Sequence, residues 1–223
     1  MEFLTPHVLF FIGPLPVTTT VVETWLVMGF LVLISMIVTR KLEFLPSRLQ
    51  NILELFVEGI MNMIEDMSPT HGKLFLPLVG TLALFIGAAN LTGLIPGLKA
   101  PTSDFNTTLA LALVVFATVP YYGIKIQGWK NYLKTYIQPS PILAPFHIIG
   151  EITRTFSLAL RLFGNILGEE IIIAILFILS PLIVPVPMML FAIFTGVIQA
   201  YIFSILTIVY LSAAVEKEGS SEG

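Results

Sequence analysis

The sequence has no cysteine and few charged residues, and both absences limit what the protein can be. Without cysteine among its 223 residues, the chain forms neither disulfide bonds nor thiolate metal sites. Charged residues make up 11% of the chain, against roughly 25% in a typical soluble domain. We find no basic run typical of nucleic-acid binding, no glycine-rich phosphate loop and no nucleophile–base pattern. We therefore predict a non-catalytic protein without a cofactor, a metal site or a nucleic-acid partner.

Apolar residues dominate the chain and occur in long blocks. They make up 56% of the sequence, and a helix of about 20 such residues spans the hydrocarbon of a bilayer. We predict an all-α integral membrane protein whose single membrane domain covers residues 1–223. Five membrane helices are expected, at residues 17–39, 74–98, 107–124, 147–180 and 188–215. Residues 1–16 contain three prolines and are predicted to be an irregular or interfacial lead-in, whereas residues 216–223 form a polar tail.

Residues 47–67 differ from these blocks because their apolar side chains recur at helical spacing, opposite a polar face. The segment is too polar to span. It is expected to be an amphipathic helix, either along the membrane surface or packed against another subunit. Residues 123–140, with lysines between aromatic residues, are expected to form an interface loop. His71 is expected to be a solvated loop residue.

The last two predicted helices are unusually long. Residues 147–180 contain no proline, and at 1.5 Å per residue they would extend about 50 Å, well beyond roughly 30 Å of hydrocarbon. We therefore expect this helix to tilt strongly. The segment PLIVPVP at residues 181–187 separates it from the last helix, which is expected to tilt as well.

The loop lysines and arginines predict the orientation of the chain. If the loops after the first and third spans are cytoplasmic, one side holds most of the basic residues and the other side holds only Lys99. The N-terminus is then outside and the C-terminus inside. The cytoplasmic set is Arg40, Lys41, Arg48, Lys73, Lys125, Lys130, Lys134 and Lys217.

A polar stripe crosses the fourth span in the sequence RTFSLALRLFGNILGEE, residues 154–170. Arg154 and Arg161 are seven residues apart and share a helical face. Burying a charge in hydrocarbon costs about 2.5–3.5 kcal/mol, so the stripe must face protein or water. Close to the same line lie Ser157, Asn165, Glu151, His147 and Glu169, whereas Glu170 points to the opposite side.

Structural roles are open for several of these polar residues. Arg154 has Glu151 three residues before it, which favours an ion pair. Arg161 has no acidic residue three or four positions away, so it would suit a carboxylate from another chain. Gln199, on the last helix, would equally form interhelical hydrogen bonds. Glu23 and Asn90, polar residues within the first and second spans, are interpreted as local structure or as ends of water-filled cavities.

Two blocks, SLALRLFGN at 157–165 and QAYIFSILTIVYLS at 199–212, closely resemble the a subunit of F-type (rotary) ATP synthases. The resemblance implies a stator subunit whose last two tilted helices lie against a ring of c subunits, in a complex that also contains b subunits of the peripheral stalk. Each c subunit carries a buried carboxylate, which is neutral in lipid and ionises beside an arginine. Two aqueous half-channels load and unload that carboxylate, and ion flow becomes rotation.

The resemblance also implies roles for individual residues. Arg161 matches the essential arginine, Asn165 and Gln199 match its polar partners, and Glu170 matches an acidic residue of the outer half-channel. Some family members have a histidine where this chain has Ala192. The outer half-channel must then use other groups, so Glu170 becomes the more important candidate. On the cytoplasmic side, Glu151 and His147 are candidates, although an ion pair between Glu151 and Arg154 is an equal possibility.

The expected location is the bacterial inner membrane, with the plastid thylakoid membrane as the alternative and H⁺ as the default ion. Two other functions are considered. A secondary transporter would need helices broken near the bilayer centre and would act alone. A structural membrane scaffold would tolerate a neutral residue in place of Arg161.

Overall fold

The computed structural model describes residues 8–12, 15–40, 48–69, 72–95, 98–137, 144–180 and 183–215. Within these ranges five helices are long and apolar enough to cross a membrane, which confirms the predicted all-α membrane fold. They are α1 (Thr19–Thr39), α3 (Gly72–Thr92), α4 (Phe105–Gln127), α6 (Ala144–Leu179) and α7 (Pro185–Val215). The other elements are strands β1 (Val8–Ile12) and β2 (Leu15–Thr18), helices α2 (Arg48–Met67) and α5 (Trp129–Ile137), and the 3-10 turn η2 (Pro101–Ser103).

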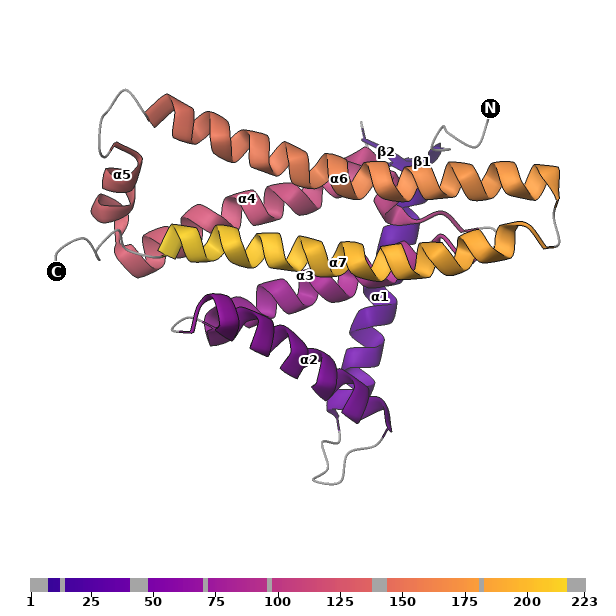
Figure 1. Cartoon of the computed structure of the whole chain (residues 1–223), viewed down its shortest axis with the longest axis horizontal. Coiled ribbons are helices and arrows are strands. Elements are labelled where there is room, and N and C mark those ends of the chain that lie inside the picture. Colours follow the sequence, from indigo (N-terminus) through magenta and orange to yellow (C-terminus); the bar gives the residue numbers. More distant parts are fainter. Residues whose placement is uncertain are drawn as a thin grey trace.

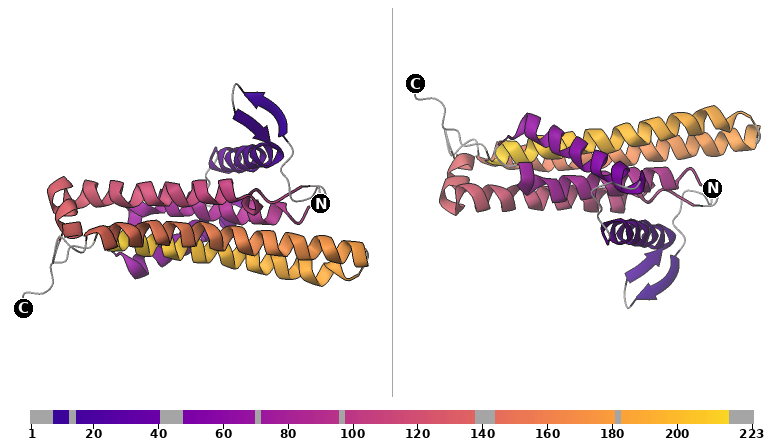
Figure 2. Two further views of the ribbon diagram at one scale, coloured as in Figure 1. Left: turned by 90° about the horizontal axis from the view of Figure 1, so that it is seen from above. Right: turned by 90° about the horizontal axis from the view of Figure 1, so that it is seen from below.

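The helices form layers, as Figures 1 and 2 show. Helices α6 and α7 lie side by side along the longest axis of the molecule, and α3 and α4 cover one side of this pair. Helix α1 runs across the far side of the α3–α4 layer, and the β1–β2 hairpin lies beyond it. One flank of the α6–α7 pair is therefore left without a covering helix in the described part of the chain.

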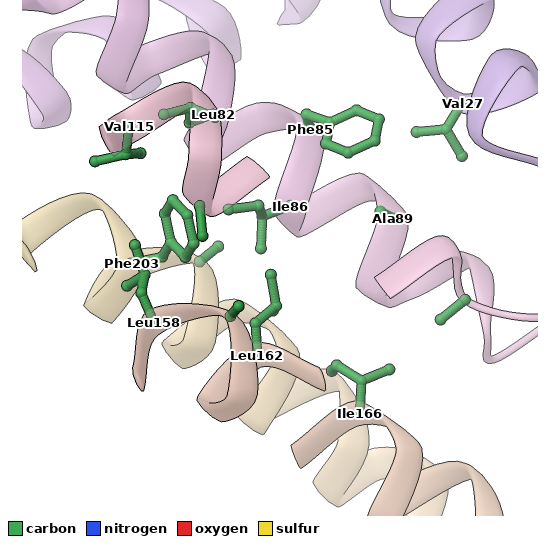
Figure 3. Close-up of a cluster of buried hydrophobic side chains, with 14 residues drawn as sticks. Val27, Leu82, Phe85, Ile86, Ala89, Val115, Leu158, Leu162, Ile166 and Phe203 are labelled. Atoms are coloured by element: carbon green, nitrogen blue, oxygen red, sulfur yellow. The ribbon is translucent and has the colours of Figure 1, made fainter. Parts of the chain in front are cut away.

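The main apolar core lies where α3, α4, α6 and α7 meet, as Figure 3 shows. Helix α6 contributes Leu158, Leu162 and Ile166, which recur every four residues and so share one face. Opposite them lie Ile86 of α3 and Phe203 of α7. Because each helix buries one face only, the rest of its apolar surface is left for lipid or for another subunit.

Helix α2 packs on its own chain through part of its apolar face. Ile60 and Ile64 are buried in a second core with Phe75 and Val79 of α3 and Ile208 of α7. Glu54, Glu58 and Glu65 of α2 are exposed. The C-terminal part of the apolar face of α2 therefore serves an intramolecular contact, and the position of α2 at the membrane surface stays a prediction.

The N-terminal segment differs from its predicted irregular structure, because β1 and β2 pair as an antiparallel hairpin. Aromatic and β-branched residues, which favour strands, occupy much of both segments. The first helix begins at Thr19 rather than at residue 17, since residues 17 and 18 still pair with β1.

The boundaries of the second and third spans also differ from those predicted. Helix α3 ends at Thr92, six residues before the expected end, and the chain turns there toward η2. Helix α4 begins two residues early, at Phe105, because the carboxylate of Asp104 accepts a hydrogen bond from the Asn106 amide and caps the helix. It continues to Gln127, where Gly128 ends it with a φ of 82°.

The predicted interface loop at 123–140 is wrong in part, because residues 129–137 form helix α5. Helices α6 and α7 each begin three residues earlier than predicted, at residues 144 and 185. Prolines 145, 185 and 187 thus lie in first turns, where the missing N–H has no helical partner to lose. The predicted polar tail at 216–223 and His71 lie outside the described residues.

Gly123 lets α4, α5 and α7 come together. A Cβ atom at this position would overlap the ring of Tyr132 and lie 3.1 Å from the carbonyl oxygen of Ala214. Gly123→Ala should therefore overpack the contact and lower the free energy of unfolding by about 1–3 kcal/mol. The measurement is SDS-induced unfolding of the purified chain in mixed micelles.

The matched control is Gly80→Ala in α3, where a Cβ atom meets nothing within 4 Å. This control should leave stability unchanged or raise it slightly. Equal stability of the two variants would contradict the packing described for Gly123.

Candidate functional site

Arg161 lies on the open flank of α6 and is exposed. No hydrogen bond or ion pair to Arg161 is found among the described residues. The preceding residue in the chain, Leu160, is apolar and 51% exposed. A guanidinium remains charged under any ordinary condition. The chain therefore presents a permanent positive charge on an apolar surface.

A hydrogen bond joins α6 and α7 beside this arginine. Asn165, one helical turn after Arg161, donates from Nδ2 to Oε1 of Gln199 over 3.0 Å. Gln199 is only 4% exposed, whereas Asn165 is exposed. This bond matches the interpretation of Gln199 as an interhelical partner, and its Asn165 end lies one helical turn from Arg161.

Arg154 does not make the ion pair with Glu151 that its spacing favours. Its Cζ lies 5.8 Å from the centroid of the Tyr210 ring in α7, a cation–π contact. No Arg154–Glu151 ion pair occurs in the described part of the chain. The ion pair was one of the alternatives that the sequence leaves open, and α7 instead brings an aromatic ring to Arg154 that the sequence of α6 does not reveal.

A cavity of about 360 Å³ opens beside the start of α6. His147, Glu151 and Arg154 line it from α6, together with Tyr132 of α5 and Tyr210 of α7. The tertiary structure thus brings the two candidates for the cytoplasmic side, His147 and Glu151, to one hollow. The polar side chains of His147, Glu151 and Arg154 on α6 therefore border an open space between helices.

Glu170 lies on the inner side of α6, away from Arg161. Its Oε1 accepts a hydrogen bond of 2.7 Å from the backbone amide of Ala100. The preceding amide, that of Lys99, donates to Oε1 of Glu23 in α1 over 3.1 Å. Two carboxylates from α1 and α6 therefore hold consecutive amides of the segment between α3 and α4. Ser103 also lies next to the Glu170 carboxyl group.

The two remaining candidates lie apart from this cluster. Glu169 is half-buried and lies beside Thr195 of α7. Ser157 is exposed, one turn before Arg161. Neither joins the Asn165–Gln199 bond.

Sequence reasoning did not associate Glu23, Lys99 or Ala100 with Glu170. The one signal was Glu23 itself, an acidic residue in an otherwise apolar span. Its partner could not be identified, because the path of residues 98–103 between the helices depends on the packing of α1, α3 and α6.

Comparison with known proteins places this arrangement in a family. The family model described as "ATP synthase A chain" matches residues 21–212. The chain belongs to this family. The resemblance noted in the two sequence blocks is confirmed, and the family match covers the spans before those blocks as well.

Individual relatives match along almost their whole length. "ATP synthase subunit a 2" of Bradyrhizobium sp. is 46% identical over 95% of this chain and 95% of its own length. "ATP synthase subunit a" of Moorella thermoacetica is 41% identical over 95% of this chain and 97% of its own. "ATP synthase subunit a 1" of Crocosphaera subtropica is 48% identical over 92% and 90%. Like the family model, these matches indicate a multi-pass membrane protein.

The Asn165–Gln199 bond makes a prediction about the α6–α7 contact. Asn165→Leu leaves the buried Gln199 amide without this partner and should lower the free energy of unfolding by roughly 1 kcal/mol. Gln199→Leu should cost a similar amount. SDS titration of the purified chain in mixed micelles measures both.

The double variant tests whether the two residues act together. Because the bond can be lost only once, Asn165→Leu with Gln199→Leu should cost less than the sum of the single changes. Strict additivity of the two effects would show that the residues do not interact.

Proposed function

We propose that this chain is the ion-conducting stator subunit of a rotary F-type ATP synthase and has no catalytic site of its own. The proposal rests mainly on Arg161, which is an exposed charge on an apolar flank with no partner among the described residues. A charge on an apolar membrane surface is costly unless a partner of opposite charge reaches it. The flank therefore suits a neighbouring subunit that supplies a carboxylate.

A ring of c subunits would supply such carboxylates one at a time. A carboxyl group facing lipid stays neutral, because an isolated charge in hydrocarbon is too costly. Beside Arg161 it ionises, since the adjacent guanidinium stabilises the charged form. The arginine thus makes each carboxyl group release its proton as it passes, and its own charge blocks a direct leak of protons between the two sides.

The positions of the polar groups support two separate access paths. At 1.5 Å per residue, Glu151 lies about 15 Å before Arg161 along α6, and Glu170 lies about 13 Å after it. The cavity with His147 and Glu151 forms the inner path. The cluster of Glu170, Lys99 and Glu23 lies on the outer path. A proton crosses only if the ring carries it from one path to the other.

The orientation and partners follow from the same proposal. The N-terminus lies outside and the C-terminus in the cytoplasm of a bacterial inner membrane, with α6 and α7 tilted against the c ring. The b subunits of the peripheral stalk hold the chain in place. The coupling ion is H⁺.

Replacing Arg161 tests the mechanism directly. In vesicles containing the whole complex, Arg161→Ala should abolish ATP-driven proton pumping while the complex still assembles, because the passing carboxyl group loses the charge that ionises it. Acridine-dye quenching measures pumping, and the amount of this chain in the purified complex measures assembly.

The matched control is Arg154→Ala, which removes the other arginine of the same helix and its contact with Tyr210. This variant should retain a measurable pumping rate. Undiminished pumping by Arg161→Ala would overturn the mechanism and leave a scaffold role. Addition of Na⁺ in a parallel assay tests the ion, since a proton-coupled complex should not respond.

Access to the cavity can be tested with thiol labelling, because the chain has no native cysteine. Thr155 lines the cavity, so Thr155→Cys should react with a water-soluble, membrane-impermeant thiol reagent added from the cytoplasmic side. Ile152→Cys is the control, because Ile152 is exposed on α6 and does not line the cavity. Equal reactivity of the two variants would exclude a water-filled inner path here.

A further inference from the structure

Asn90 makes a buried polar connection between three elements in the region of the bilayer. It lies near the end of α3 and is 7% exposed. Its Oδ1 accepts a hydrogen bond of 2.7 Å from the hydroxyl group of Thr102 in η2, which is fully buried. Its Nδ2 donates to the backbone carbonyl oxygen of Gly196 in α7 over 3.0 Å. One amide thus links η2, α3 and α7.

The contact with α7 is close because residue 196 is glycine. A Cβ atom at Gly196 would lie 3.2 Å from Cβ of Asn90, which is tighter than ordinary van der Waals contact. The missing side chain allows the amide of Asn90 to reach the backbone of α7 itself. A hydrogen bond to the backbone holds both the rotation of α7 and its position along its own axis.

Gly196 lies one helical turn before Gln199, the residue that accepts the hydrogen bond from Asn165 beside Arg161. Apolar contacts between helices in lipid are weakly directional, since lipid tails are as apolar as the side chains. The apolar core around Phe203 therefore fixes the rotation of α7 less strictly than a hydrogen bond to its backbone does. The Asn90–Gly196 hydrogen bond, one turn from Gln199, fixes the rotation of α7 close to the Asn165–Gln199 bond.

We propose that Asn90 is a positioning residue for ion transfer, which sets the rotation of α7 so that Gln199 meets Asn165 and both amides flank Arg161. The inference rests on the proposed function of Arg161. Asn90 touches neither the arginine nor the passing carboxyl group. Thr102 supports this role by orienting the side-chain amide of Asn90, so that Nδ2 rather than Oδ1 faces the carbonyl oxygen of Gly196.

The test compares variants in vesicles that contain the whole complex. Asn90→Leu keeps the number and branching of the side-chain heavy atoms and removes both hydrogen bonds. The rate of ATP-driven proton pumping per assembled complex should fall about fivefold, which corresponds to one hydrogen bond. Thr102→Val, which leaves the Asn90–Gly196 bond possible, should lower the rate by a smaller factor, about twofold. If the complex with Asn90→Leu does not assemble, the pumping rate of the Thr102→Val complex tests the proposal instead.

Thr92→Val is the matched control, since within the described ranges the Thr92 hydroxyl group bonds to the Ala88 carbonyl of its own helix and to no other element. It should pump at the rate of the unchanged complex. A normal rate for an assembled Asn90→Leu complex would overturn the proposal, as would a normal rate for Thr102→Val if Asn90→Leu does not assemble.

A double variant separates positioning from general stability. If Asn90 acts through Gln199, adding Asn90→Leu to Gln199→Leu should lower the pumping rate by less than about twofold further. A full fivefold further loss would show that Asn90 serves only the packing of the bundle, and would overturn the proposal. Arg161→Ala is measured alongside. Normal pumping by that variant would refute the proposed function, whereas its failure together with normal pumping by Asn90→Leu would refute the role of Asn90 alone.

Discussion

Polar groups in hydrocarbon need partners, and this constraint explains how the helices of the chain are arranged. Glu170 finds the amide of Ala100, and Asn90 finds Thr102 and Gly196. Arg161 differs from these residues, since it is exposed and has no hydrogen bond or ion pair in the described part of the chain. Such a departure from the pattern of the neighbouring groups is expected at functional sites.

The short segment between α3 and α4 satisfies this constraint for several helices at once. Its amides at residues 99 and 100 bond to carboxylates of α1 and α6, and Thr102 reaches α7 through Asn90. Gly93 keeps the approach open, because a Cβ atom there would lie 3.0 Å from Oε1 of Glu170. Since apolar packing in lipid is only weakly directional, these few polar bonds give the helices a defined register.

Helix α6 therefore has two different sides. Its inner side is held by the apolar core and by the Glu170–Ala100 bond, whereas its open flank carries the arginine. This division suits a stator. Under the proposed function, a ring turning against the flank would exert a load on α6, which the contacts with α3, α4 and α7 would resist while the guanidinium stays exposed.

The sequence by itself determined the membrane class, the five spans and the family, because apolar length and the blocks at 157–165 and 199–212 are local properties of the chain. It also placed Arg161 and Asn165 on one helical face, since helical periodicity requires only their spacing. Only the tertiary structure decided which groups become neighbours. Arg154 meets Tyr210 rather than Glu151, and Glu23 is joined to Glu170 through two consecutive amides. Such contacts depend on how separate helices pack and on where a loop turns, and spacing along one helix carries no information about either.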